Sequence, residues 1–112
     1  MTIETEAGIT SPRTAEDYER RAWLHYARHD QPQAEADFRK ALEMNASLVD
    51  SAYGLGMTLK AAGDIEKAQG AFQGVIGLLD EGGVKDEARA KILRALTMAQ
   101  IKFLSRPAAE SA

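Results

Sequence analysis

Residues 49–82 read VDSAYGLGMTLKAAGDIEKAQGAFQGVIGLLDEG, and this stretch decides the fold. It contains no proline, few β-branched residues and many strong helix formers, so it predicts helix rather than strand. Gly63 suits the left-handed position that ends a helix, and Asp64 directly after it suits the N-cap of the next one. We therefore predict one helix over about 48–62 and a second over about 65–79, joined by a short turn.

The same helix–turn–helix arrangement occurs once more, earlier in the chain. Corresponding residues of the two copies are separated by a constant offset in residue number. This offset produces four identities: Ala27 with Ala61, Asp30 with Asp64, Ala34 with Ala68 and Phe38 with Phe72. All four fall at corresponding points of a helix–turn–helix unit, which is the signature of an internal repeat. The chain is therefore predicted to contain two repeat units, residues 15–48 and 49–82.

Start and stop signals place three further helices around this unit, over about 14–28, 31–44 and 84–105. The N-caps expected before the first three helices of the chain are Thr14, Asp30 and the turn of Asn45 and Ser47. The last helix follows the Gly82-Gly83 break and closes at Pro107. The predicted fold class is all-α, with about five antiparallel helices in residues 14–106, between a flexible leader (1–13) and a disordered tail (107–112).

The repeat resembles the tetratricopeptide repeat (TPR) family. The residues that carry the resemblance are Leu55, Gly56, Gly63, Asp64, Ile65, Ala68 and Phe72 in the second unit, and Tyr18, Ala22, Ala34, Phe38 and Ala41 in the first. Three positions depart from the family pattern: Arg21 replaces an apolar residue, Ala46 replaces a proline and Val75 replaces a small residue. The resemblance implies a right-handed stack of antiparallel helix hairpins, an α-solenoid, in which small residues let paired helices approach closely.

The last helix is predicted to cap this stack. One stripe at helical spacing is expected to cover the preceding helices: Val84, Ala88, Ile92, Ala95, Ala99 and Phe103. Leu93, Ile101 and Leu104 lie off that stripe, and they belong either to a wide buried face or to an open end that pairs with a second copy. Gly70, Gly74 and Gly77 share one helix face, which is either exposed drift or a site of close approach by the last helix or a second subunit.

The resemblance implies that the first helix of each unit lines a concave groove that binds a peptide or helix of another protein. The groove residues carried over by position are Glu16, Glu19, Trp23, Tyr26, Asp50, Tyr53, Met57 and Lys60. The aromatic and methionine side chains are the expected apolar anchors, and the acidic ones favour a partner with basic and apolar residues. The alternative is that Trp23 packs in the core or under the N-terminal leader. Glu19, Trp23 and Gly54 stand where a subset of the family has lysine and asparagine, so that subset's grip on acidic C-termini is not expected.

Other function classes find little support in the sequence. The chain has no cysteine, no Ser–His–Asp order of a catalytic triad and no glycine-rich phosphate-binding loop. Its mildly acidic net charge disfavours nucleic-acid binding. No stretch approaches about 18 apolar residues and no signal-peptide pattern is present, so we expect a cytoplasmic protein. Because no catalytic motif is found either, we expect a non-enzymatic protein without cofactor. His25 and His29 have the spacing of a metal pair, but a third ligand cannot be named and helix-packing and turn roles are the stronger interpretation, so no metal site is predicted.

The formal charge of −3 is distributed unevenly along the chain. Residues 1–83 contain 14 acidic and 8 basic residues, whereas residues 84–106 contain 6 basic and 2 acidic ones. The repeat body is therefore acidic and the last helix basic. This polarity suits head-to-tail self-association as well as closure within one chain, so a homo-oligomeric assembly protein is the alternative function.

Overall fold

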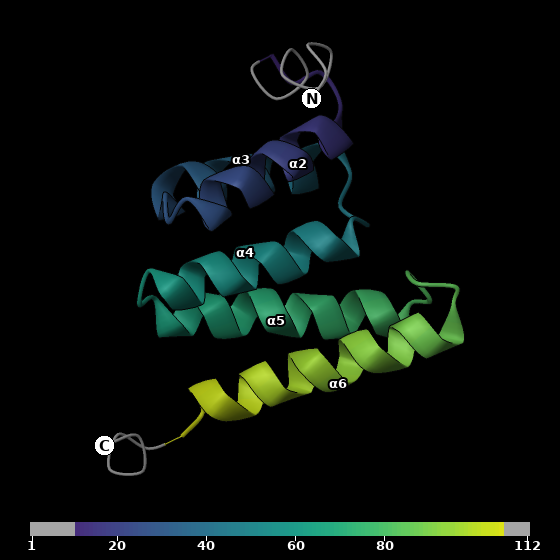
Figure 1. The fold of residues 1–112 in the computed structure, drawn as a ribbon. Helices are drawn as coiled ribbons and strands as arrows, with labels where there is room; N and C mark the ends of the chain where they lie inside the picture. The colour runs from purple at the N-terminus through teal and green to yellow at the C-terminus, as the bar shows by residue number, and fades with distance from the viewer. Residues whose placement is uncertain (1–10, 107–112) are drawn as a thin grey trace.

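A computed structural model describes residues 11–106 of the chain as five α-helices without a strand (Figure 1). The helices are α2 (Ala15–Ala27), α3 (Gln31–Met44), α4 (Val49–Ala61), α5 (Ile65–Asp80) and α6 (Glu87–Leu104). Each helix packs against the next one in the chain, α2 on α3, α3 on α4, α4 on α5 and α5 on α6. The all-α prediction is confirmed. Most of the predicted leader and the whole predicted tail lie outside the described residues.

The period of the repeat is visible in the bounds of the helices. α2 and α4 have the same length of 13 residues, and the offset between their first residues equals the offset between the N-caps Asp30 and Asp64. Both aspartates cap as predicted, because each accepts a hydrogen bond from the backbone N–H three residues on. The predicted cap of α4 is wrong: Leu48 occupies the N-cap without a side-chain bond.

The start of α2 carries a capping box. Thr14 Oγ1 accepts from the Asp17 N–H at 3.0 Å, and Asp17 Oδ2 accepts from the Thr14 N–H at 3.3 Å. The backbone N–H of Arg13 donates to the same carboxylate and holds the pKa of Asp17 below its ordinary value. This pairing fixes the end of the helix that carries Trp23.

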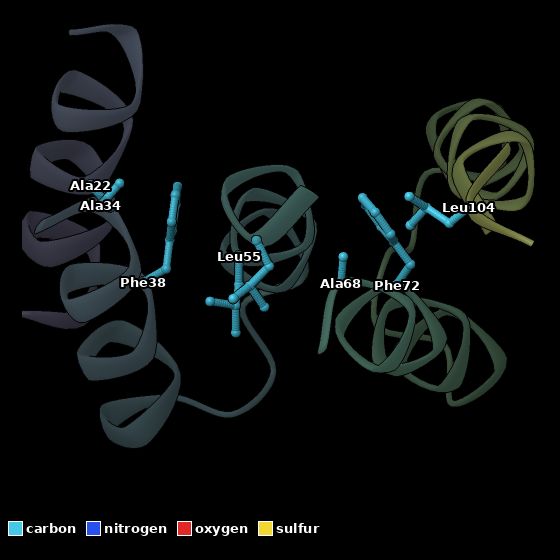
Figure 2. Close-up of a cluster of buried hydrophobic side chains, with 8 residues drawn as sticks. Ala22, Ala34, Phe38, Leu55, Ala68, Phe72 and Leu104 are labelled. Atoms are coloured by element: carbon cyan, nitrogen blue, oxygen red, sulfur yellow. The ribbon is translucent and has the colours of Figure 1, made fainter. Parts of the chain in front are cut away.

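Two phenylalanines form the centre of the core, one from each repeat unit. Phe38 of α3 and Phe72 of α5 are fully buried, as are Ala34 and Ala68 one turn before them. Figure 2 shows the Phe38 ring in the space between α3 and α4, and the Phe72 ring near Leu104 on α6. Ala34, Phe38, Ala68 and Phe72 are among the residues that carry the sequence repeat.

Glycine on α4 makes room for both rings. A Cβ atom on Gly56 would lie 2.6 Å from Phe72 Cε1, and a Cβ on Gly54 would overlap the ring of Phe38. Residues 54 and 56 lie about 200° apart around a helix, so the two rings contact α4 on nearly opposite sides. Only a narrow arc of α4 is left facing solvent.

α6 differs from its prediction in where it begins and in which face it buries. It begins at Glu87, where Asp86 provides the N-cap, and not near residue 84. The buried residues are Leu93, Thr97 and Leu104, whereas Ile92 of the predicted stripe is 62% exposed and Phe103 is 53% exposed. The prediction was wrong because α6 carries two apolar stripes side by side, and helical spacing alone does not show which one faces α5.

The residues expected at a self-association surface are also placed differently. Leu93 and Leu104 are buried, and Ile101 packs against the core, so these three side chains serve the contact with α5. The glycines of α5 are exposed, and a Cβ on Gly70, Gly74 or Gly77 would meet no atom within 4 Å. Of the two sequence-based alternatives for this glycine face, the structure agrees with the exposed one, since the last helix does not approach it closely.

The two groups of glycines should respond oppositely to alanine. We expect Gly56→Ala to lower the free energy of unfolding by about 2 kcal/mol, because a rigid ring occupies the space of the new methyl group. Replacing Gly70, Gly74 and Gly77 together should raise it by roughly 2 kcal/mol, because open helix positions gain propensity. Thermal unfolding followed by circular dichroism measures both; a destabilised triple variant would contradict the open surface.

The two hairpin turns differ at one position in a way that can be tested. His29 has φ 62° and the corresponding Gly63 has φ 83°, so both occupy the left-handed region, which costs a histidine about 1 kcal/mol. We expect His29→Gly to raise the melting temperature. Arg28→Gly is the matched control, because residue 28 has φ −90° and should lose stability. A melting temperature that falls in His29→Gly would show that the imidazole itself stabilises the turn.

Candidate functional site

Hydrogen bonds between side chains join α2, the first helix of the first unit, to α4, the first helix of the second unit, and join α4 to α6. Ser51 Oγ on α4 donates a 2.6 Å hydrogen bond to Glu19 Oε2 on α2. Arg89 on α6 donates to both carboxylate oxygens of Asp50 on α4, at 2.9 and 2.8 Å. Side-chain contacts therefore connect α2 to α4 and α4 to α6. We call the predicted groove residues of α2 and α4 the α2–α4 face; its members are Glu16, Glu19, Trp23, Tyr26, Asp50, Tyr53, Met57 and Lys60.

The four predicted anchors are all partly buried and all pack against one core cluster; they are Trp23, Tyr26, Tyr53 and Met57. The Trp23 ring meets the Phe38 ring edge to face, with centroids 5.0 Å apart. Tyr53 meets Phe72 with centroids 5.5 Å apart. Each hairpin thus supports one surface aromatic ring on its core phenylalanine, an arrangement that stabilises both rings. For Trp23 the two sequence-based alternatives are combined, since the ring packs on the core and keeps part of its surface exposed.

The acidic residues of the face do not share one environment. Glu16 is exposed at the start of α2, and the described residues offer it no ion pair. Glu19 accepts a hydrogen bond from the Ser51 hydroxyl. Asp50 pairs with Arg89, and both side chains are about half exposed, so this pair is worth at most about 1 kcal/mol. The negative charge available to a partner is therefore concentrated on α2.

α6 adds residues to this surface that the sequence did not assign to it. Lys60 Nζ donates to Gln100 Oε1 at 2.8 Å and lies 4.7 Å from the centre of the Phe103 ring. Phe103 thereby borders the α2–α4 face, although helical spacing had placed it in the buried stripe. The sequence carries no signal that separates the two apolar stripes of α6, because cationic residues flank both of them.

A separate apolar pocket of about 360 Å³ opens between α3 and α5. Its lining comes from three helices and the loop after α3: Leu42, Ala46, Ala52, Leu55, Ala71, Gly74 and Leu78. Gly74 contributes to this hollow because it has no side chain to fill it. One of the three glycines considered for self-association therefore lines this pocket. The pocket is not part of the α2–α4 face.

A polar cluster between α2 and α3 accounts for the unusual Arg21 and for one of the two histidines. Arg21 donates two hydrogen bonds to the buried Asp37, from Nε at 2.6 Å and from Nη2 at 2.9 Å. The bond from Asp37 raises the pKa of the Arg21 guanidinium. His25 Nε2 lies 3.6 Å from Asp37, and Nδ1 lies 4.0 Å from Asp30. His25 thus occupies the helix-packing position expected for it.

His29 lies in the turn after α2, so the two histidines have different surroundings. In the part of the chain that the structure describes, no group of three His, Cys, Asp or Glu side chains could hold a metal ion. None of the described helices is long and apolar enough to span a bilayer.

No protein-family model matches the chain, and no curated protein matches it. A proposal about its function therefore rests on its own side chains and their contacts.

The Arg21–Asp37 pair can be tested against the second repeat, which has Leu55 and Ala71 at the corresponding positions. Asp37→Ala alone should lower the free energy of unfolding by about 3 kcal/mol, because it removes one partner of a largely buried ion pair. The double variant Arg21→Leu/Asp37→Ala copies the second unit and should recover most of this loss. Urea unfolding measures both; a double variant no more stable than Asp37→Ala would show that the pair has no apolar equivalent.

Proposed function

We propose that this chain is a protein-interaction module of the TPR type, without enzymatic activity or cofactor, that binds a peptide or helix of another protein along the α2–α4 face. The observation that carries the proposal is the set of three aromatic rings and one methionine held partly exposed over the core. Side chains of this kind provide large contact areas and lose little conformational entropy on binding, because their positions are already fixed. A small adaptor or a chaperone for one assembling subunit would have such a face, and we place its action in the cytoplasm.

The repeat geometry supports this proposal independently. A constant offset between helix starts, small residues facing buried phenylalanines and first helices aligned side by side are all features expected from the resemblance to TPR proteins. In that family the first helices line the ligand groove. The partner is proposed to lie across α2 and α4.

The charge of the face favours a partner with basic and apolar residues. Glu16 and Glu19 lie on the same helix face as Trp23, at spacings of about one and two turns. A lysine or arginine beside an apolar side chain would meet both features at once. Asp50 adds less to this preference, because Arg89 already pairs with it.

Self-association remains the second candidate function, and it has lost three of its six expected residues. Leu93, Ile101 and Leu104 pack inside the chain, which leaves the exposed glycine face of α5. A small-residue face without a close neighbour is weaker support than partly buried aromatic anchors. Sedimentation of the purified chain at high concentration decides this point.

The test of the α2–α4 face uses two sets of short synthetic peptides that share leucine and phenylalanine but carry either lysine or glutamate. We expect the lysine set to quench or shift Trp23 fluorescence and to bind about tenfold more tightly than the glutamate set. Met57→Ala should weaken binding about tenfold, and Glu16→Lys should reduce the preference for lysine peptides.

Met98→Ser is the matched control for this experiment, because Met98 is 52% exposed on α6 and outside the α2–α4 face. Circular dichroism confirms that each variant is folded. Equal affinity for both peptide sets, or binding that Met57→Ala leaves unchanged, would refute the assignment of this face.

A further inference from the structure

α6 exposes a row of large apolar side chains that no other part of the described chain covers. Four of the six large hydrophobic residues that are exposed in the structure lie on this helix: Ile92, Leu96, Met98 and Phe103. Ile92, Leu96, Ala99 and Phe103 follow one another at spacings of four, three and four residues. We call these four residues the α6 stripe. Such spacing forms a straight seam along a helix, the kind of surface that accepts a second helix.

Cations border the α6 stripe along its length. Lys60 lies over the ring of Phe103 on the side of α4, and the Arg106 guanidinium lies 5.9 Å from the same ring. Lys91 and Lys102 lie along the other border, by helical position, and both are exposed. Residues 88–106 contain five basic residues and no acidic one.

Ion pairs with carboxylates divide these cations into two groups, those that face the preceding helices and those that border the α6 stripe. Arg89 is paired with Asp50 and Arg94 with Asp80, at 2.8 Å in both cases. Neither Lys91 nor Lys102 has a carboxylate partner among the described residues. An occupant of the α6 stripe would therefore gain from bringing acidic side chains to this border.

A second α6 is a poor occupant of this seam. Two α6 helices packed along the stripe would bring Lys91 and Lys102 of both copies together on one border, with no carboxylate between residues 88 and 106 to compensate them. Like charges at a helix seam oppose pairing and select a different partner.

We propose that the α6 stripe binds an amphipathic helix of a partner protein, whose apolar residues are flanked by glutamate or aspartate. This site adjoins the α2–α4 face where Lys60 meets Phe103, but it lies along α6 and has the opposite charge preference. A chain with both sites would hold two different segments, a basic one on α2 and an acidic helix on α6.

The probes are two synthetic helical peptides with the same leucine seam, flanked by glutamate in one and by lysine in the other. Fluorescence anisotropy of the labelled peptides is measured against the full chain. We expect the glutamate peptide to bind at least about tenfold more tightly than the lysine peptide, with a preference that weakens in salt. The double variant Lys91→Glu/Lys102→Glu should invert the preference.

Matched variants separate this site from its surroundings. Leu96→Ser/Phe103→Ser should weaken the glutamate peptide by about tenfold or more, whereas Met98→Ser, equally exposed but off the α6 stripe, should leave binding unchanged. Met57→Ala should also leave it unchanged, so failure of this site and failure of the α2–α4 face give different results. All of these side chains except Met57 are exposed, and circular dichroism checks the fold.

Three results would overturn the proposal. The first is equal binding of the two peptides, and the second is loss of binding in Met98→Ser equal to that in Leu96→Ser/Phe103→Ser. The third is a dimer of the chain alone that Leu96→Ser/Phe103→Ser dissociates, which would make a second copy the occupant.

Discussion

The contact between α4 and two phenylalanine rings is the constraint on which the rest of the structure depends. Phe38 reaches α4 from the preceding hairpin and Phe72 reaches it from its own hairpin partner, each against a glycine that leaves room for the ring. These contacts lie on nearly opposite sides of the helix. α4 can therefore present only one arc to solvent, and that arc carries Tyr53 and Met57. The position of the candidate binding face follows from how the core is packed.

The repeat made the two hairpins predictable from the sequence. α6 was harder to predict because it lies beyond the end of the repeat. Identities one period apart located α2 to α5 because each unit repeats the aspartate cap of its second helix and the small residues and phenylalanine of its core. One further period after Leu48, the N-cap of α4, falls on Gly82, whereas the N-cap of α6 is Asp86, so the period no longer applied. With two apolar stripes side by side, at Ile92 and Leu93, the sequence offered no means of choosing the one that α5 covers.

Contacts between residues far apart in the chain explain what else the sequence could not provide. Asp50 appeared to be a free acidic residue of the groove, but Arg89 pairs with it across 39 positions. Arg21 appeared to be a departure from an apolar position, but Asp37 on the facing helix compensates it. In both cases the sequence shows the type of residue, and only the packed structure shows its partner.

The two hairpins have the same shape but not the same cohesion. The first is held in part by an ion pair and turns through a histidine in the left-handed region, whereas the second has apolar residues and glycine at these places. In a stack whose units contact only their neighbours, such a difference lets one unit open without the other. Backbone amides of α2 and α3 would then exchange with solvent before those of α4 and α5. Because Trp23 and Tyr26 lie on the less cohesive hairpin, opening of that hairpin would change their distance from α4 while the half of the α2–α4 face built on α4 stays fixed.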